Sequence, residues 1–236
     1  MKTILIVGSS GGIGTALTEF FLKQKCQLIL HYFKNKPNVH ENSNIMLVKA
    51  NITQESEVVS LMDSIQERYG KLDAVINNAG ISISEISWKT NISSWDKTIA
   101  VNLTGPFLIS KHALPMMRAN SWGRIIFISS IVAQTGFVGT SAYSASKSGL
   151  LGLTKSLAKE VASKGITVNS IALGYFNVGM IEDVPADIQE AIVESIPKKQ
   201  LGNPTQLFET IQFILSENSD YLTGQTINLN GGLYMA

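Results

Sequence analysis

A glycine-rich turn near the start of the chain restricts the possible fold more than any other stretch. Residues 2–7 form a short apolar run, residues 8–14 read GSSGGIG, and residues 15–25 carry apolar side chains at helical spacing. This order favours a phosphate-binding loop between a strand and a helix, because glycines allow close backbone approach and a helix N-terminus attracts anions. The spacing is G-x-x-x-G-x-G, which differs from the commoner dinucleotide signature G-x-G-x-x-G.

The rest of the chain alternates between short apolar runs and amphipathic segments, giving about seven strands and about six helices. This alternation predicts an α/β fold, a doubly wound parallel sheet with helices on both faces. No linker interrupts the 236 residues, so we predict one domain, residues 1–236. Strands are expected at 2–7, 27–32, 44–50, 72–76, 124–128, 166–172 and 225–229, and helices at 15–25, 55–69, 99–117, 142–163, 186–196 and 205–215.

Charge and cysteine content argue against several classes of protein. The net charge is +1 without basic or acidic blocks, so no nucleic-acid or anionic-membrane surface is predicted. Cys26 is the only cysteine and the three histidines are scattered, so we expect neither a disulfide nor a metal site. No apolar run reaches the roughly 20 residues of a membrane helix, and the run 4–7 is too short for a signal peptide. We expect a cytoplasmic protein.

Tyr143 and Lys147 lie four residues apart in the predicted helix 142–163, and therefore on one helix face. A fixed ammonium beside a phenol lowers the pKa of the phenol, which turns it into a usable acid or base. Ser130 closely follows the apolar run 124–128, and ligands of open α/β sheets bind at the carboxyl ends of strands. These three side chains are expected in one pocket, although an isolated Y-x-x-x-K is more often a surface pair.

The end of the second predicted strand bears on cofactor choice. An acidic residue there would bind the ribose 2′-hydroxyl of NAD, and the sequence His31-Tyr32-Phe33-Lys34-Asn35-Lys36 contains none. Lys34 or Lys36 can meet a 2′-phosphate, or both can be solvated loop lysines.

Together these motifs resemble the short-chain dehydrogenase/reductase family in order and spacing, over essentially the whole chain. Within it, the length, the C-terminal tail and residues 142–147 are most similar to β-ketoacyl-acyl carrier protein reductases. The resemblance implies a Rossmann-like fold and NAD(P)-dependent carbonyl reduction. The residues that carry it are Gly8, Gly12, Gly14, Asn77, Asn78, Ala79, Gly80, Asn102, Ser130, Tyr143, Lys147, Asn230, Gly231 and Gly232.

The resemblance also implies roles for individual residues. Tyr143 would donate a proton to the carbonyl oxygen, Lys147 would lower the pKa of the phenol and bond the nicotinamide ribose, and Ser130 would polarise the carbonyl. Asn102 would hold a water that links Lys147 to solvent. The residues expected at the cofactor are Gly8, Ser10, Gly12, Ile13, Gly14, Tyr32, Lys34, Asn51, Ile52, Asn78, Ala79, Gly80, Tyr143, Lys147 and Phe176.

Several positions depart from the family pattern. Leu173 and Val178 stand where the family has a Pro and a Thr that bonds the nicotinamide carboxamide, and Asn51 replaces an Asp at the adenine. Gly11 occupies a position where NADP-preferring relatives often carry Arg. The missing acid after the second strand favours NADPH over NADH.

The expected function is NADP(H)-dependent carbonyl reduction, with a 3-oxoacyl chain on acyl carrier protein as substrate. The apolar segment 174–197 would cover that substrate, or would only pack as a lid. An NAD(H)-dependent alcohol or sugar dehydrogenase and a non-catalytic nucleotide-binding sensor or scaffold are the alternatives. By resemblance we expect a homotetramer packed through helix 142–163, whose Gly149, Gly152 and Leu153 suit either that contact or a monomer core.

Overall fold

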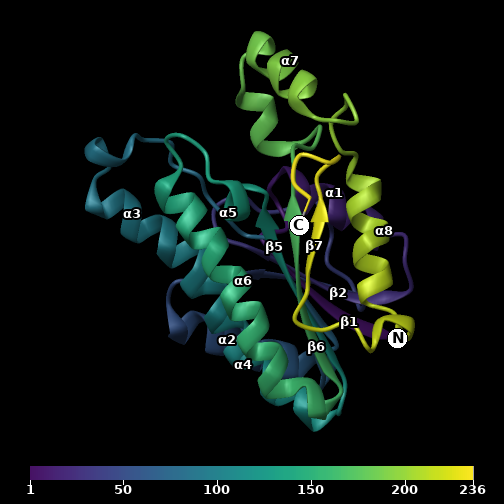
Figure 1. The fold of residues 1–236 in the computed structure, drawn as a ribbon. Helices are drawn as coiled ribbons and strands as arrows, with labels where there is room; N and C mark the ends of the chain where they lie inside the picture. Colours follow the sequence, from purple (N-terminus) through teal and green to yellow (C-terminus); the bar gives the residue numbers. More distant parts are fainter. Residues whose placement is uncertain (236) are drawn as a thin grey trace.

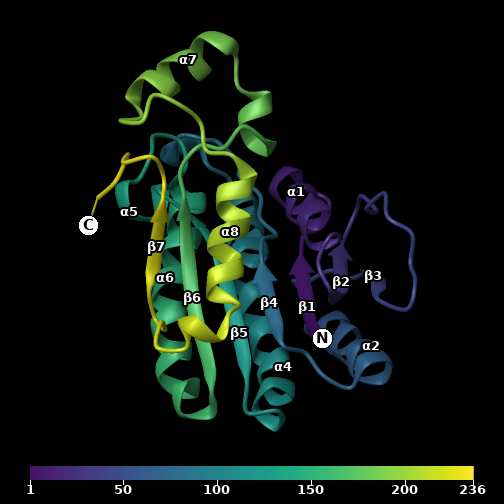
Figure 2. The same ribbon diagram turned by 90° about the vertical axis from the view of Figure 1, so that its right-hand side faces the viewer.

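The computed structural model of this protein describes residues 1–235. Within them, seven parallel strands form one sheet in the order β3-β2-β1-β4-β5-β6-β7. The order in which the strands are added reverses between β1 and β4, so the predicted doubly wound α/β fold is confirmed (Figure 2). The strands are β1 (Lys2–Val7), β2 (Cys26–Tyr32), β3 (Ile45–Lys49), β4 (Ala74–Asn77), β5 (Gly123–Ser130), β6 (Ile166–Leu173) and β7 (Thr226–Leu229).

Helices cover both faces of the sheet, as Figure 1 shows. One apolar cluster joins the sheet to α2, α4 and α6, and the other joins it to α1 and α8. The central strands β1, β4, β5 and β6 are buried on both sides, which explains their largely apolar sequences, whereas the edge strands β3 and β7 are half-buried. The helices are α1 (Gly12–Phe21), α2 (Glu55–Tyr69), α3 (Ile92–Ile99), α4 (Gly105–Ala119), α5 (Val132–Thr135), α6 (Ser141–Val161), α7 (Ala186–Ser195) and α8 (Pro204–Ile214), with short turns η1 (Ser87–Lys89), η2 (Ala100–Thr104), η3 (Ala162–Lys164), η4 (Gly179–Asp183) and η5 (Glu217–Ser219).

The single helix predicted over 99–117 is wrong in its boundaries. The helical path begins at Ile92, continues through a π-helical turn at Ala100–Thr104, and ends at Ala119. Residues 92–98 show no clear helical period in the sequence, because serines and other polar residues dominate them. Among residues 92–99, Thr98 is the only buried one. A π turn inserts one residue into the helical repeat, which shifts the apolar face at this point.

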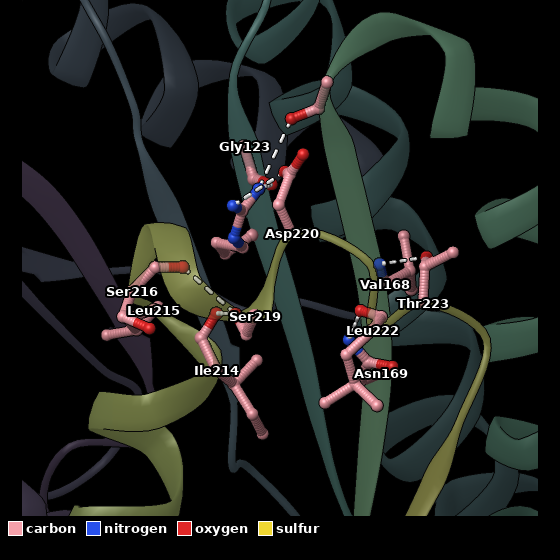
Figure 3. Close-up of polar contacts among 12 residues, drawn as sticks. Gly123, Val168, Asn169, Ile214, Leu215, Ser216, Ser219, Asp220, Leu222 and Thr223 are labelled. Atoms are coloured by element: carbon pink, nitrogen blue, oxygen red, sulfur yellow. Dashed lines mark hydrogen bonds and ion pairs between the residues drawn. The ribbon is translucent and has the colours of Figure 1, made fainter.

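Two segments distinguish the opposite edges of the sheet. At the carboxyl edge, η4 and α7 form a lid that stands above the strands (Figure 1). At the amino edge, the segment 216–225 is tied to the starts of β5 and β6 (Figure 3). There the Nδ2 of Asn169 donates to the carbonyl of Leu222 at 2.8 Å, and the Val168 amide donates to the Thr223 hydroxyl at 3.1 Å.

Candidate active site

A cavity of about 510 Å³ lies at the carboxyl edge of the sheet, between the strand ends and the lid. It is the place where the topology brings the predicted catalytic side chains together. Of the residues predicted from the sequence, those that line it are Ile13, Asn78, Gly80, Ser130, Tyr143, Lys147 and Phe176.

Tyr143 is the third residue of α6, and its phenol faces Ser130 at the end of β5. Burial raises the pKa of its phenol, and a hydrogen bond with the hydroxyl of Ser130 lowers that pKa in part. The net shift of the Tyr143 pKa is therefore upward and Lys147 is not among its causes, so the role of Lys147 in lowering this pKa stays a prediction. The Lys147 ammonium lies 5.7 Å from the centroid of the Tyr143 ring and donates a hydrogen bond elsewhere. Tyr143 is thus held as a neutral phenol, the form that can donate a proton.

Lys147 is a buried cation with only 4% of its surface exposed. Its Nζ donates to the carbonyl of Ile128 at 2.7 Å. Burial lowers the pKa of this ammonium to about 8, and no carboxylate opposes the shift. Lys147 therefore lines the cavity as a cation that has no counter-ion among residues 1–235.

Asn102 lies in the π turn and is fully buried. Its side-chain amide pairs with both backbone groups of Ile81, accepting from the amide and donating to the carbonyl, each at 2.8 Å. It also donates to the Ser146 hydroxyl at 3.1 Å. These bonds fix the chain just after Gly80, where an added Cβ would lie 3.3 Å from the Lys147 Nζ. Asn102 shapes the wall beside Lys147, and its water-holding role stays a prediction.

The glycine turn forms a cradle of bare backbone suited to a phosphate. Gly8 has a φ of +78°, and a Cβ there would lie 2.7 Å from the Cα of Ala79. A Cβ on Gly14 would lie 2.0 Å from the Gly8 carbonyl oxygen. The helix α1 begins after Gly11, which provides no side-chain cap to the first amides. Uncapped amides at a helix N-terminus fit a pyrophosphate.

The lid reaches this cradle at one backbone contact. A Cβ added to Gly12 would lie 2.4 Å from the Cα of Gly179, whose φ is +77°. Val178, beside it, lines the cavity and packs against the apolar core. Its side chain has no hydroxyl, unlike that of the Thr that the resemblance implies at this position.

The predicted adenosine side is more open. Tyr32 is half-buried and Lys34 is exposed. Exposure of Lys34 is compatible both with contact to a 2′-phosphate and with a solvated loop lysine. The Oδ1 of Asn51 accepts from the Thr53 amide at 3.2 Å and from its hydroxyl at 2.9 Å, so this oxygen caps its own turn. Ile52 is a core residue packed under Gly105. Ser10 is half-buried in the glycine turn.

Sequence reasoning missed part of the cavity wall. Phe137 and Thr140 line it from the loop after α5, and Ser82 and Ser84 line it from the segment after β4. The amide of Glu85 donates to the carbonyl of Gly139 at 2.9 Å, which ties these two walls together. The sequence signal that could have indicated this wall was the aromatic residue Phe137 between Gly136 and Gly139. Neither loop has a hydrophobic period to predict its position.

Across residues 1–235, no helix combines the length and hydropathy needed to cross a bilayer. In the same residues, no group of three or more His, Cys, Asp or Glu side chains is arranged to hold a metal ion.

Comparison with known proteins matches the chain to one family. The family model described as Enoyl-(Acyl carrier protein) reductase matches residues 7–234. Nodulation protein G of Azospirillum brasilense is 34% identical, with 98% of each chain covered. The 3-oxoacyl-[acyl-carrier-protein] reductase FabG of Rickettsia felis is 37% identical, covering 99% of this chain and 97% of the relative. FabG of Staphylococcus aureus (strain N315) is 33% identical, covering 99% and 98%. The chain therefore belongs to the short-chain dehydrogenase/reductase family of oxidoreductases.

Proposed function

We propose that this protein reduces the ketone of a 3-oxoacyl thioester carried on acyl carrier protein, using NADPH, with Tyr143 as the proton donor. The observation that carries the proposal is the convergence of Ser130, Tyr143 and Lys147 on one cavity. The names of the relatives in Rickettsia and Staphylococcus support the substrate.

The chemistry that a bound nicotinamide would supply is hydride transfer to the carbonyl carbon. The residues of this chain handle the oxygen. Ser130 donates a hydrogen bond to the carbonyl and stabilises the negative charge that develops on it. Tyr143, held neutral by burial, gives its proton to that oxygen. The cation of Lys147 stabilises the phenolate that remains.

The cradle and the strand ends support NADPH as the cofactor. Gly8, Gly12 and Gly14 would hold the pyrophosphate against the uncapped start of α1. Lys34 and Lys36 are exposed after β2, where no acid opposes a 2′-phosphate. Residues 1–236 would form one unit, because the cradle and the proton donor both lie on the same sheet edge.

The walls of the cavity support an acyl chain over a sugar. Val132, Phe137, Met180 and Val184 are apolar residues of the cavity wall. Phe137 and Met180 are 62% and 54% exposed, so an apolar rim continues outward from the site. Apolar side chains in a pocket wall suit a hydrocarbon tail.

We also expect four copies to assemble through α6. Gly152 has open space around it. Gly149 does not contribute, because a Cβ there would lie 2.7 Å from the Leu103 side chain within the chain itself. A monomer mass by light scattering at micromolar concentration would contradict the tetramer. A cytoplasmic location stays a prediction.

The catalytic proposal is tested with Tyr143→Phe. Oxidation of NADPH by a 3-oxoacyl thioester should slow by about 10²–10⁴-fold, the range for loss of a general acid. Binding of NADPH, followed by nicotinamide fluorescence, should change little. Tyr221→Phe is the matched control, because that ring is fully exposed. Unchanged turnover in Tyr143→Phe would exclude the proposed proton donor.

A further inference from the structure

His31 is a buried titratable residue that the proposed catalysis does not use. It lies in β2, in a row of apolar residues, and is 2% exposed. Its Nδ1 lies 3.1 Å from the amide nitrogen of Gly8, and its Nε2 lies 2.9 Å from the carbonyl oxygen of Ala50. The ring therefore bridges the end of β1 to the end of β3.

The two partners determine the protonation state of the ring. The amide of Gly8 can only donate, so Nδ1 must be without a proton. The carbonyl of Ala50 can only accept, so Nε2 must carry the proton. The neutral Nε2–H tautomer alone satisfies both contacts. A protonated ring would direct a second N–H at the amide of Gly8.

His31 also holds the glycine turn through its own backbone. Its carbonyl accepts from the Ser9 amide and the Ser9 hydroxyl, both at 2.9 Å. The carbonyl of Gly8 in turn accepts from the Asn78 Nδ2 at 2.8 Å. The first glycine of the cradle is thus fixed on one side by His31 and on the other by the strand that leads to the catalytic cavity.

We propose that neutral His31 is a positioning residue for the cofactor cradle, and that its protonation releases the Gly8 amide and weakens binding of the nicotinamide dinucleotide. The effect on binding rests on the proposed function. The contact between His31 and Gly8 does not, and it can be tested in the protein alone.

The surroundings favour the neutral ring. Burial lowers the pKa of His31, and the hydrogen bond to Ala50 opposes this in part. Among residues 1–235, no charged group adds to this shift of the His31 pKa. From β3, Lys49 is exposed; on α2, Glu57 accepts from the Asn51 amide, and Glu55 pairs at the surface with Lys111 and His112. Gly8 and Ser9 of the turn carry no charge.

The first experiment measures the protein without cofactor. Nitrogen NMR of His31 should show the neutral Nε2–H tautomer at pH 7. Hydrogen exchange of the Gly8 amide should be slow in the wild type and in His31→Asn, which keeps an acceptor, and faster in His31→Leu, which has none. Equal exchange in all three proteins, or the opposite tautomer, would overturn the proposal.

The second experiment measures affinity for NADP⁺ by calorimetry from pH 8 to pH 5. Relative to His31→Asn, which cannot protonate, the wild type should lose about tenfold in affinity per pH unit below the pKa of His31. The ratio of the two proteins cancels the titration of the ligand phosphate. His112→Asn, at the surface pair with Glu55, should follow the wild type.

The outcomes separate the two proposals. Parallel pH profiles for wild type and His31→Asn would overturn the role of His31 in binding. If NADP⁺ and NAD⁺ both fail to bind at any pH, the proposed function fails. The exchange of the Gly8 amide then still decides whether His31 holds the turn, and thermal melts show whether each variant is folded.

Discussion

Arg124 and Lys147 are buried cations near opposite ends of β5, and they are stabilised in different ways. Arg124 is the second residue of the strand, at the amino edge, and is fully buried. Its guanidinium donates to Asp220 at 3.1 Å and to the carbonyls of Gly123 and Gly165 at 3.0 and 3.3 Å. Lys147 has one carbonyl partner near the carboxyl end, and no carboxylate.

The difference shows which end of the sheet is built for stability and which for chemistry. The Cζ of Arg124 also lies 4.4 Å from the centroid of the Trp122 ring, so favourable partners surround its charge on several sides. Figure 3 shows Asp220 beside Gly123 in this cluster. A buried charge without a counter-ion costs stability, and such groups cluster at functional sites. The charge of Lys147 is left for a ligand or a reacting oxygen.

The largest effect that would sharpen this contrast is expected for Lys147→Met. Reductase kcat/KM should fall by about 10²–10⁴-fold, because the ammonium that lies 5.7 Å from the centroid of the Tyr143 ring is lost. The free energy of unfolding should stay the same or rise, because an unpaired buried charge is removed. Lys159→Met, on the exposed side of α6, is the control for both measurements.

Arg124→Met should show the reverse pattern. We expect the free energy of unfolding to fall by about 3 kcal/mol, since buried carbonyls lose a charged donor. Turnover per folded molecule should remain within about threefold of wild type, because the cluster lies at the far edge of the sheet. Urea unfolding measures the first and steady-state kinetics the second, with exposed Arg118→Met as control. A large loss of turnover in folded Arg124→Met would break the contrast.

Stability at alkaline pH should depend on Lys147. Its folded pKa is about 8, below its ordinary value of 10.5, so between these values the unfolded chain binds more protons than the native one. The free energy of unfolding should therefore rise with pH, by up to about 1.4 kcal/mol per unit. Subtracting the profile of Lys147→Met isolates this slope. Identical profiles in the two proteins would show that Lys147 is not destabilised by burial.

Asp220→Asn should have the smallest effect. Because the Asp220 side chain is 69% exposed, water screens its ion pair with Arg124. The loss should be about 1 kcal/mol in the free energy of unfolding, with no change in turnover. A loss as large as that of Arg124→Met would mean that the carboxylate, and not the two backbone carbonyls, stabilises the guanidinium.

Much of the fold could be predicted because the strands are apolar and the helices periodic. The run Lys2–Val7 and the helix Glu55–Tyr69 have the predicted boundaries. The helix through 92–119 was predicted too short, because the π turn at Asn102 breaks the period. The turn α5 at Val132–Thr135 was not predicted, since four residues are too few to show a period.

The site, like the fold, could be predicted from the sequence only in part. The spacing of Tyr143 and Lys147 placed both on one helix face, and the strand order placed Ser130 beside them. Sequence could not show that the Lys147 ammonium turns to the Ile128 carbonyl, nor that burial raises the pKa of Tyr143. Nor could it show that His31 meets Gly8, because that contact depends on the register between β1 and β2.

The most direct test of the contrast is an NMR titration of the Lys147 side chain. Lysine labelled at Cε, with Lys147→Met used to assign the signal, reports the charge of this one ammonium in the folded protein. A midpoint near pH 8 would confirm a buried cation held without a counter-ion. A midpoint at the ordinary value of 10.5 would contradict it, and would mean that Lys147 is as well compensated as Arg124.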